Sequence, residues 1–137
     1  MNQHHVQLVQ ESYELVKPIA GIAADLFYDR LFQLDPNLRP MFKSDLGEQK
    51  HNLMTTLTFA VAGLNKPERI ITTVQRLGAR HTGYGVQPQH YQTVGAAILW
   101  TLAQGLGDAF TPEVEEAWTA VYTLLAETMQ EGANGHN

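Results

Sequence analysis

Apolar residues recur at intervals of three and four along almost the whole chain, and no stretch alternates steadily between apolar and polar residues. The first spacing gathers apolar side chains on one face of an α-helix, whereas steady alternation is typical of a β-strand. The pattern therefore predicts an all-α fold, in which each helix turns an apolar face toward a common core.

Prolines, glycines and capping residues divide this pattern into six substantial helices and one short helix. The short helix is expected at residues 36–42, where Asp35 supplies a cap and Pro36 occupies the first helical position. The six substantial helices are expected at residues 6–16, 18–34, 48–64, 67–83, 88–106 and 112–131.

The composition is typical of one soluble globular domain, because 44% of the 137 residues are hydrophobic and 17% are charged. No repeat, low-complexity segment or interior linker interrupts the chain. We expect a single domain over residues 1–132 and a flexible tail at 133–137, with no room for a second cofactor domain.

The charge and the absent residue types exclude several classes of partner and site. A formal net charge of −5, without a run of Lys or Arg, argues against nucleic acid or an anionic membrane as a partner. Because the chain has no cysteine, disulfides, thiolate metal sites and thiol chemistry are excluded. The polar amino terminus resembles no secretion signal and no apolar run is long enough to span a bilayer, so a cytoplasmic location is expected.

His81 has the most informative position among the six histidines. It continues the apolar stripe Ile70, Val74 and Leu77 at spacings of 4, 3 and 4 residues, so it faces the core. A lone histidine there is either a metal ligand or a core residue with a satisfied hydrogen bond, and the pattern alone favours the second. His90, in a first helical turn, is expected at the surface. No helix face carries the histidine pair that a bare metal ion would need.

Three other polar side chains, Tyr28, Gln49 and Tyr91, also lie on the inward faces of their expected helices. Each has an ordinary explanation, since a buried tyrosine often sends its hydroxyl to solvent or to a carbonyl, and a glutamine in a first turn is usually solvated. Phe42, at the end of the short helix, could be a core residue at a corner. None of these positions identifies a function alone.

Five segments in their order and spacing resemble the globins, and specifically the bacterial single-domain hemoglobins and the globin half of flavohemoglobins. They are "LFYDRLF", "DPNLRPMF", "QKHNLM", "RLGARHTGYGV" and "HYQTVG". The likeness covers nearly the whole chain, and its most specific feature is a short, proline-opened helix ending in Phe42, followed 39 residues later by His81. The resemblance implies a globin fold around a heme pocket.

The resemblance also implies that the cofactor is heme b and that His81 is the protein's axial ligand to the heme iron. Phe42 matches the phenylalanine that packs on the heme face, and Tyr91 matches a tyrosine that hydrogen-bonds near the proximal imidazole. The matches to apolar pocket positions are Leu53, Leu77, Val86 and Val94. Candidates to meet the heme propionates are Arg80, Lys50 and His51, with solvated surface charge as the alternative.

On the ligand side of the heme, Tyr28 matches the distal tyrosine of the bacterial group. Gln49 holds the position, one turn before Leu53, that is a histidine in many animal globins. His51 is rejected as a distal ligand because it lies roughly 200° around the helix from the required face. The resemblance fails at one position, where flavohemoglobins carry a proximal glutamate and this chain carries Ala133.

These residues imply tight binding of O2. If a hydrogen bond to bound O2 contributes about 1.5–3 kcal/mol, it slows O2 escape by roughly tenfold to over a hundredfold. The first hypothesis is a protein that binds O2 for storage, scavenging or sensing, with NO and CO as further ligands. The second is a nitric oxide dioxygenase that depends on an external reductase. A third, a heme-free interaction module, is disfavoured because Phe42 and His81 are both present.

Overall fold

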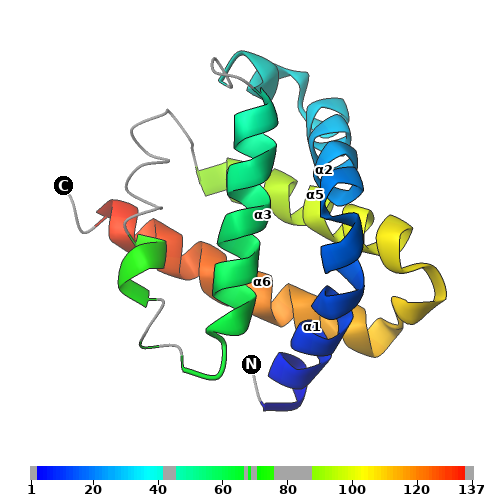
Figure 1. The fold of residues 1–137 in the computed structure, drawn as a ribbon. Helices are drawn as coiled ribbons and strands as arrows, with labels where there is room; N and C mark the ends of the chain where they lie inside the picture. The colour runs from blue at the N-terminus through cyan, green and yellow to red at the C-terminus, as the bar shows by residue number, and fades with distance from the viewer. Residues whose placement is uncertain (1–2, 42–45, 67, 69–70, 76–87, 135–137) are drawn as a thin grey trace.

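The structure of the chain is a computed structural model that describes residues 3–41, 46–66, 68, 71–75 and 88–134. Within these ranges the chain is helical apart from short connections, and no strand occurs. The all-α fold expected from the apolar spacing is confirmed (Figure 1).

The helices occur in the expected order. Their bounds are α1 Gln3–Val16, α2 Ala20–Leu34, α3 Leu46–Ala62, α5 Pro88–Leu106 and α6 Pro112–Asn134, with 3-10 turns η1 Lys17–Ile19, η2 Pro36–Met41 and η4 Gly107–Ala109. Five of the six substantial helices are therefore observed, and the short helix is the 3-10 turn η2. The one that remains, expected at 67–83, lies mostly outside the described residues, but its residues 71–75 are helical.

Several helix ends differ from expectation. The first helix begins at Gln3 rather than at Val6, and the third ends at Ala62 rather than at Leu64. Because Pro18 has no N–H to donate, the chain tightens into the 3-10 turn η1, and α2 begins at Ala20 rather than at the proline. The third helix begins at Leu46, two residues early. The last helix continues to Asn134, so the first two residues of the expected tail are helical.

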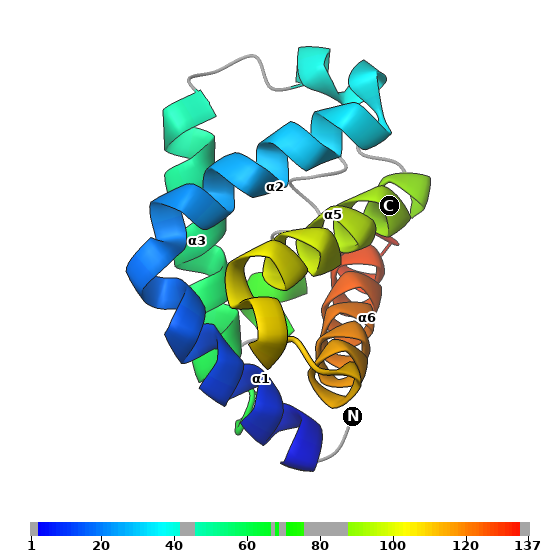
Figure 2. The same ribbon diagram turned by 90° about the vertical axis from the view of Figure 1, so that its right-hand side faces the viewer.

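The helices cross one another rather than lying in a parallel bundle. In Figure 1, α3 runs in front of α5 and α6, and in Figure 2 α3 and α6 occupy opposite sides of the molecule. The most extensive contacts join α1 to α6 and α2 to α5, and α3 contacts both α1 and α2. This arrangement brings the middle of α2, at Asp25 and Tyr28, beside the first turns of α3.

The core is built where the first and last helices meet. The largest fully buried side chains are Tyr13, Leu31, Val9 and Val121. Trp118 of α6 donates its indole N–H to the Ser12 hydroxyl at 2.8 Å, and its ring lies beside Tyr13 with centroids 6.1 Å apart. These contacts hold α6 on α1 and support the helices that carry the site residues. None of the described helices is long and apolar enough to cross a membrane.

Candidate functional site

The site begins with Tyr28, on the inward face of α2. Its side chain is only 5% exposed, which confirms the inward orientation expected from the sequence. The ring packs edge-on against Phe27, with centroids 5.0 Å apart, and beside Phe32 at 6.0 Å. Its hydroxyl donates to the main-chain carbonyl oxygen of Gln49 at 3.4 Å. The phenol is therefore held by aromatic packing and directed at the first turn of α3.

Burial controls the protonation of this phenol. Desolvation raises the pKa of Tyr28 from 10.0 to about 12, because the phenolate loses the water that would stabilise its charge. A phenol with the ordinary pKa of 10.0 is already protonated at neutral pH, so the hydroxyl is able to donate a hydrogen bond, and burial extends this state to higher pH.

Gln49 lies in the first turn of α3 and is half-buried. Two candidate residues follow it. The Lys50 ammonium forms an ion pair with the Asp25 carboxylate of α2 at 2.8 Å, and His51 is exposed. Asp25 is exposed and Lys50 is half-buried, so solvent screens the ion pair and it adds little stability, but it links α2 to α3 close to Tyr28. The exposure of His51 agrees with its rejection as a distal ligand.

Two apolar positions complete the described part of the site. Leu53 of α3 and Val94 of α5 are half-buried and pack against the core. On the helical segment 71–75, Val74 is 5% exposed, so the stripe that includes His81 faces inward at this point. The remaining candidates lie outside the described residues, and their roles stay predictions. They are Phe42, Leu77, Arg80, His81 and Val86.

A pair of tyrosines, of which the sequence analysis identified one member, joins the start of α5 to α6. Tyr91 is half-buried, and its main-chain carbonyl accepts a hydrogen bond from the Tyr122 hydroxyl of α6 at 2.6 Å. Burial raises the pKa of both phenols, and their proximity raises that of Tyr122 further. Gly95 makes this contact possible, since a Cβ there would lie 2.7 Å from Cε2 of Tyr122.

Tyr122 could have been found from two signals in the sequence. It lies four residues after Trp118 on the apolar face of the last helix, and Gly95 interrupts an otherwise strongly apolar helix. A glycine inside a helix costs stability, so it often marks a close approach by a neighbouring group. The partner of that glycine could not be named without the tertiary structure.

The comparisons with known proteins agree with this arrangement. A family model described as Globin matches residues 25–129. The flavohemoprotein of Vibrio cholerae is 32% identical over 97% of this chain and 35% of its own length, and that of Bacillus subtilis is 29% identical over 89% of this chain and 31% of its own. The chain thus spans about a third of the length of these relatives.

Solved structures with the same fold include two bacterial proteins. A Rhodothermus marinus protein, proposed to be a nitric oxide dioxygenase and engineered as a carbene transferase, has a TM-score of 0.88 at 24% identity, over 98% of this chain and 94% of its own. A bacterial globin from Campylobacter jejuni has a TM-score of 0.85 at 20% identity, over 98% of this chain and 97% of its own. Because the family model covers well over half of the sequence, the chain belongs to the globin family.

Proposed function

We propose that this globin binds heme b and that its main activity is tight, reversible binding of O2. The observation that carries the proposal is the position of Tyr28, a buried phenol whose hydroxyl reaches the first turn of α3 at Gln49. This is the place where the resemblance to bacterial hemoglobins puts the ligand side of the heme.

The described residues fit a heme in chemical character. A porphyrin needs apolar contacts over its faces and a few polar groups near its metal. Leu53 and Val94 supply half-buried apolar surface on α3 and α5, and Tyr28 and Gln49 supply hydrogen-bond donors on one side. These residues therefore suit a porphyrin. They offer apolar surface to the ring and hydrogen-bond donors to a gas bound on one side of it.

Each remaining candidate has a defined task in this proposal. Heme, when bound, supplies an iron atom that takes a diatomic gas. His81 would hold that iron by its imidazole, and Phe42 would pack on the ring. Lys50, His51 or Arg80 would meet the propionates, and Lys50 would then exchange its present partner Asp25 for a propionate.

Tyr28 would discriminate between gases by donating a hydrogen bond. O2 accumulates negative charge in a ferrous heme protein far more than CO does, so a donor stabilises O2 selectively. The hydroxyl is 3.4 Å from the Gln49 carbonyl, which is a long hydrogen bond. The amide of Gln49 would act as the second donor, with three side-chain torsions to fix rather than two.

Visible spectra of the ferric, ferrous and O2-exposed protein test this function. The proposal expects a heme-loaded protein whose ferrous form gives an O2 spectrum at low O2 pressure, reversed when the gas is removed. A purified chain that takes up no heme, or that shows no reversible O2 spectrum, contradicts it.

A second candidate function is NO dioxygenation, in which O2, NO and one electron give nitrate. Ferrous heme, when bound, would supply that electron, and a reductase would restore it. It is favoured by the similarity to flavohemoproteins and to a protein proposed to be a nitric oxide dioxygenase. In this proposal a reductase supplied as a separate protein would be the partner; the chain matches about a third of the length of those relatives. Nitrate yield tests it: one equivalent per heme is expected without a reductase, and repeated turnover with one. Sustained turnover of the chain with NAD(P)H alone would contradict this dependence.

A further inference from the structure

Two aromatic side chains that can each lose one electron lie together in the core. Tyr13 of α1 and Trp118 of α6 are 2% and 3% exposed. Their ring centroids are 6.1 Å apart, and the ring planes are inclined by 50°. Because rings at this distance exchange an electron readily, an electron lost from Trp118 can be replaced from Tyr13.

The indole end of this pair lies toward the proposed heme site. Trp118 lines the same pocket as Leu53, which is an expected heme contact. Its indole N–H donates to the Ser12 hydroxyl at 2.8 Å. Ser12 is buried and donates in turn to the Leu8 carbonyl at 2.7 Å, so it is a poor acceptor for a proton. An oxidised Trp118 would therefore keep its N–H proton and would be restored by an electron alone.

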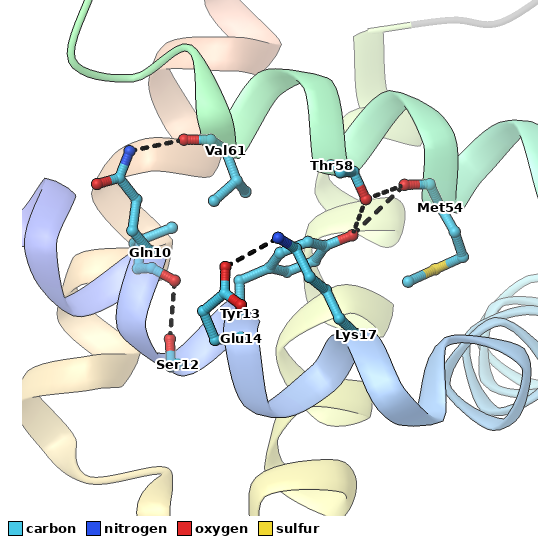
Figure 3. A network of polar contacts seen from close by, with 9 residues as sticks. Gln10, Ser12, Tyr13, Glu14, Lys17, Met54, Thr58 and Val61 are labelled. Atoms are coloured by element: carbon cyan, nitrogen blue, oxygen red, sulfur yellow. Dashed lines mark hydrogen bonds and ion pairs between the residues drawn. The ribbon is translucent and has the colours of Figure 1, made fainter.

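The phenol end of the pair has a route for its proton, which Figure 3 shows. The Tyr13 hydroxyl lies 2.8 Å from the Thr58 hydroxyl and 3.4 Å from the Met54 carbonyl oxygen. Thr58 gives its own proton to the Met54 carbonyl at 2.8 Å, so its oxygen is able to accept from Tyr13. Because Thr58 is exposed, a proton that leaves Tyr13 can pass to water at the surface.

A surface groove between α1 and α3 adjoins this end of the pair. Tyr13 and Thr58 line it, together with Glu14 and Lys17, which form an ion pair at 2.8 Å. Burial raises the pKa of the Tyr13 phenol, and the Thr58 hydrogen bond and the Lys17 charge act against this rise. The groove has a volume of about 290 Å³. Since a cavity of about 150 Å³ holds benzene, the groove has room for a molecule with one aromatic ring.

We propose that Trp118 and Tyr13 form a relay that carries oxidising equivalents, one electron at a time, from heme oxidised by a peroxide to a small phenol in the groove. The supply of these equivalents rests on the proposed function, whereas the transfer from one ring to the other rests on the pair itself.

Each round of the relay balances in electrons and protons. Tyr13 gives one electron to the Trp118 radical cation and its hydroxyl proton to water through Thr58, which leaves neutral Trp118 and a tyrosyl radical. A phenol in the groove then gives a hydrogen atom to Tyr13 and becomes a phenoxyl radical. Two rounds supply the two electrons and two protons that convert one hydrogen peroxide into two waters.

The transfer between the rings can be tested without heme, because the chain has no cysteine of its own. Thr119→Cys places a single thiol at an exposed position next to Trp118, where a ruthenium photo-oxidant can be attached. After a flash with an electron acceptor in solution, the absorption of an indole radical should appear and give way to that of a tyrosyl radical. Tyr13→Phe, which keeps the ring, should leave the indole radical without this successor.

The second tryptophan supplies a matched control. Trp118→Phe should remove most of the tyrosyl signal, and Trp100→Phe should leave it in place, since Trp100 is on α5 beside Arg30 at 5.2 Å. Equal tyrosyl signals in these two variants, or an unchanged decay of the indole radical in Tyr13→Phe, overturn the relay.

The proton route has its own test in the labelled protein. Thr58→Val should slow the appearance of the tyrosyl radical by about fivefold, the factor for one ordinary hydrogen bond, because the more distant Met54 carbonyl remains as an acceptor. Thr128→Val is the control, because its hydroxyl also donates to a carbonyl four residues earlier, away from the groove. Equal rates in Thr58→Val and Thr128→Val overturn this route.

Hydrogen peroxide added to the heme-loaded protein tests the supply of oxidising equivalents. A spin trap should form an adduct on Tyr13, located by mass spectrometry of peptides, and a small phenol should suppress it. Trp118→Phe should lose the adduct and Trp100→Phe should keep it. Transfer from the ruthenium label without an adduct under peroxide refutes heme as the source. A chain that takes up no heme refutes the proposed function and leaves the transfer between the rings standing.

Discussion

The Tyr28 hydroxyl lies 3.4 Å from the main-chain carbonyl oxygen of Gln49, so the two residues assigned to the ligand side meet from different helices. The contact uses the backbone carbonyl of Gln49 and not its side-chain amide. A substitution of the glutamine side chain therefore leaves this contact in place, and the roles of phenol and amide are separable by experiment.

Gln49→Leu should speed O2 dissociation less than Tyr28→Phe does. The amide is on a longer side chain and loses more rotamer freedom when it is fixed on a ligand. Stopped-flow O2 dissociation in the single and double variants should show non-additive effects if both donors serve one ligand. A Gln49→Leu effect larger than that of Tyr28→Phe would reverse the assignment of the main donor.

His81→Ala should abolish normal heme retention, because it removes the proposed axial ligand. The rate of heme transfer to an acceptor protein measures how much retention is lost. Imidazole added to the variant should restore a histidine-like spectrum. His90→Ala is the control, since this residue lies in the first turn of α5 and is not expected to reach the iron. Retention of a histidine-ligated spectrum by His81→Ala without imidazole would show that another residue binds the iron.

The titration of Tyr28 should contribute to the pH dependence of the free energy of unfolding. Below pH 10 its phenol is protonated in the folded and unfolded chains, so its contribution is constant. As pH rises from 10.0 to about 12, the unfolded chain releases the proton first, and the free energy of unfolding falls.

Denaturant unfolding between pH 10.0 and about pH 12 checks whether the free energy of unfolding falls as predicted. Tyr28→Phe should make the fall shallower without removing it, because the pKa values of Tyr13, Tyr91 and Tyr122 are also raised. O2 dissociation should show no titration of the donor below about pH 10, since the phenol remains protonated. An identical fall in the unmodified and Tyr28→Phe proteins would contradict the raised pKa.

Gly95→Ala should destabilise the protein by about 1–3 kcal/mol, the usual cost of forcing atoms into a packed contact. The new Cβ would lie 2.7 Å from the Tyr122 ring. Gly21→Ala is the matched control, since a Cβ at this helical glycine has no neighbour within 4 Å, and it should stabilise α2 by roughly 0.5–1 kcal/mol. Urea midpoints measure both changes. A Gly95→Ala protein as stable as the Gly21→Ala protein would show that α5 and α6 are not closely packed at Tyr122.

The sequence predicted those features that depend on local periodicity. The inward face of Tyr28 follows from its spacing to Ala24 and Leu31, and the structure confirms that all three side chains are buried. Helix bounds shifted by two or three residues at several ends, and at Pro18 the cause is the missing N–H of the proline.

Features that depend on pairing between distant elements were not predictable. Nothing in the sequence around Asp25 indicates its ion pair with Lys50. Similarly, the Tyr13 hydroxyl forms a hydrogen bond with the hydroxyl of Thr58, which lies 45 positions away in the chain. Such contacts are set by how the helices cross, and periodicity within one helix carries no information about that crossing.

The dissociation of O2 from Tyr28→Phe tests the central claim most directly. The substitution removes one hydroxyl and leaves the ring that packs against Phe27 and Phe32. Stopped-flow measurement should show O2 leaving roughly tenfold to over a hundredfold faster, the factor for one charge-assisted hydrogen bond. CO dissociation should change far less, because CO is a poor hydrogen-bond acceptor. Equal O2 dissociation rates in the two proteins would contradict the account of Tyr28 as the residue that holds O2.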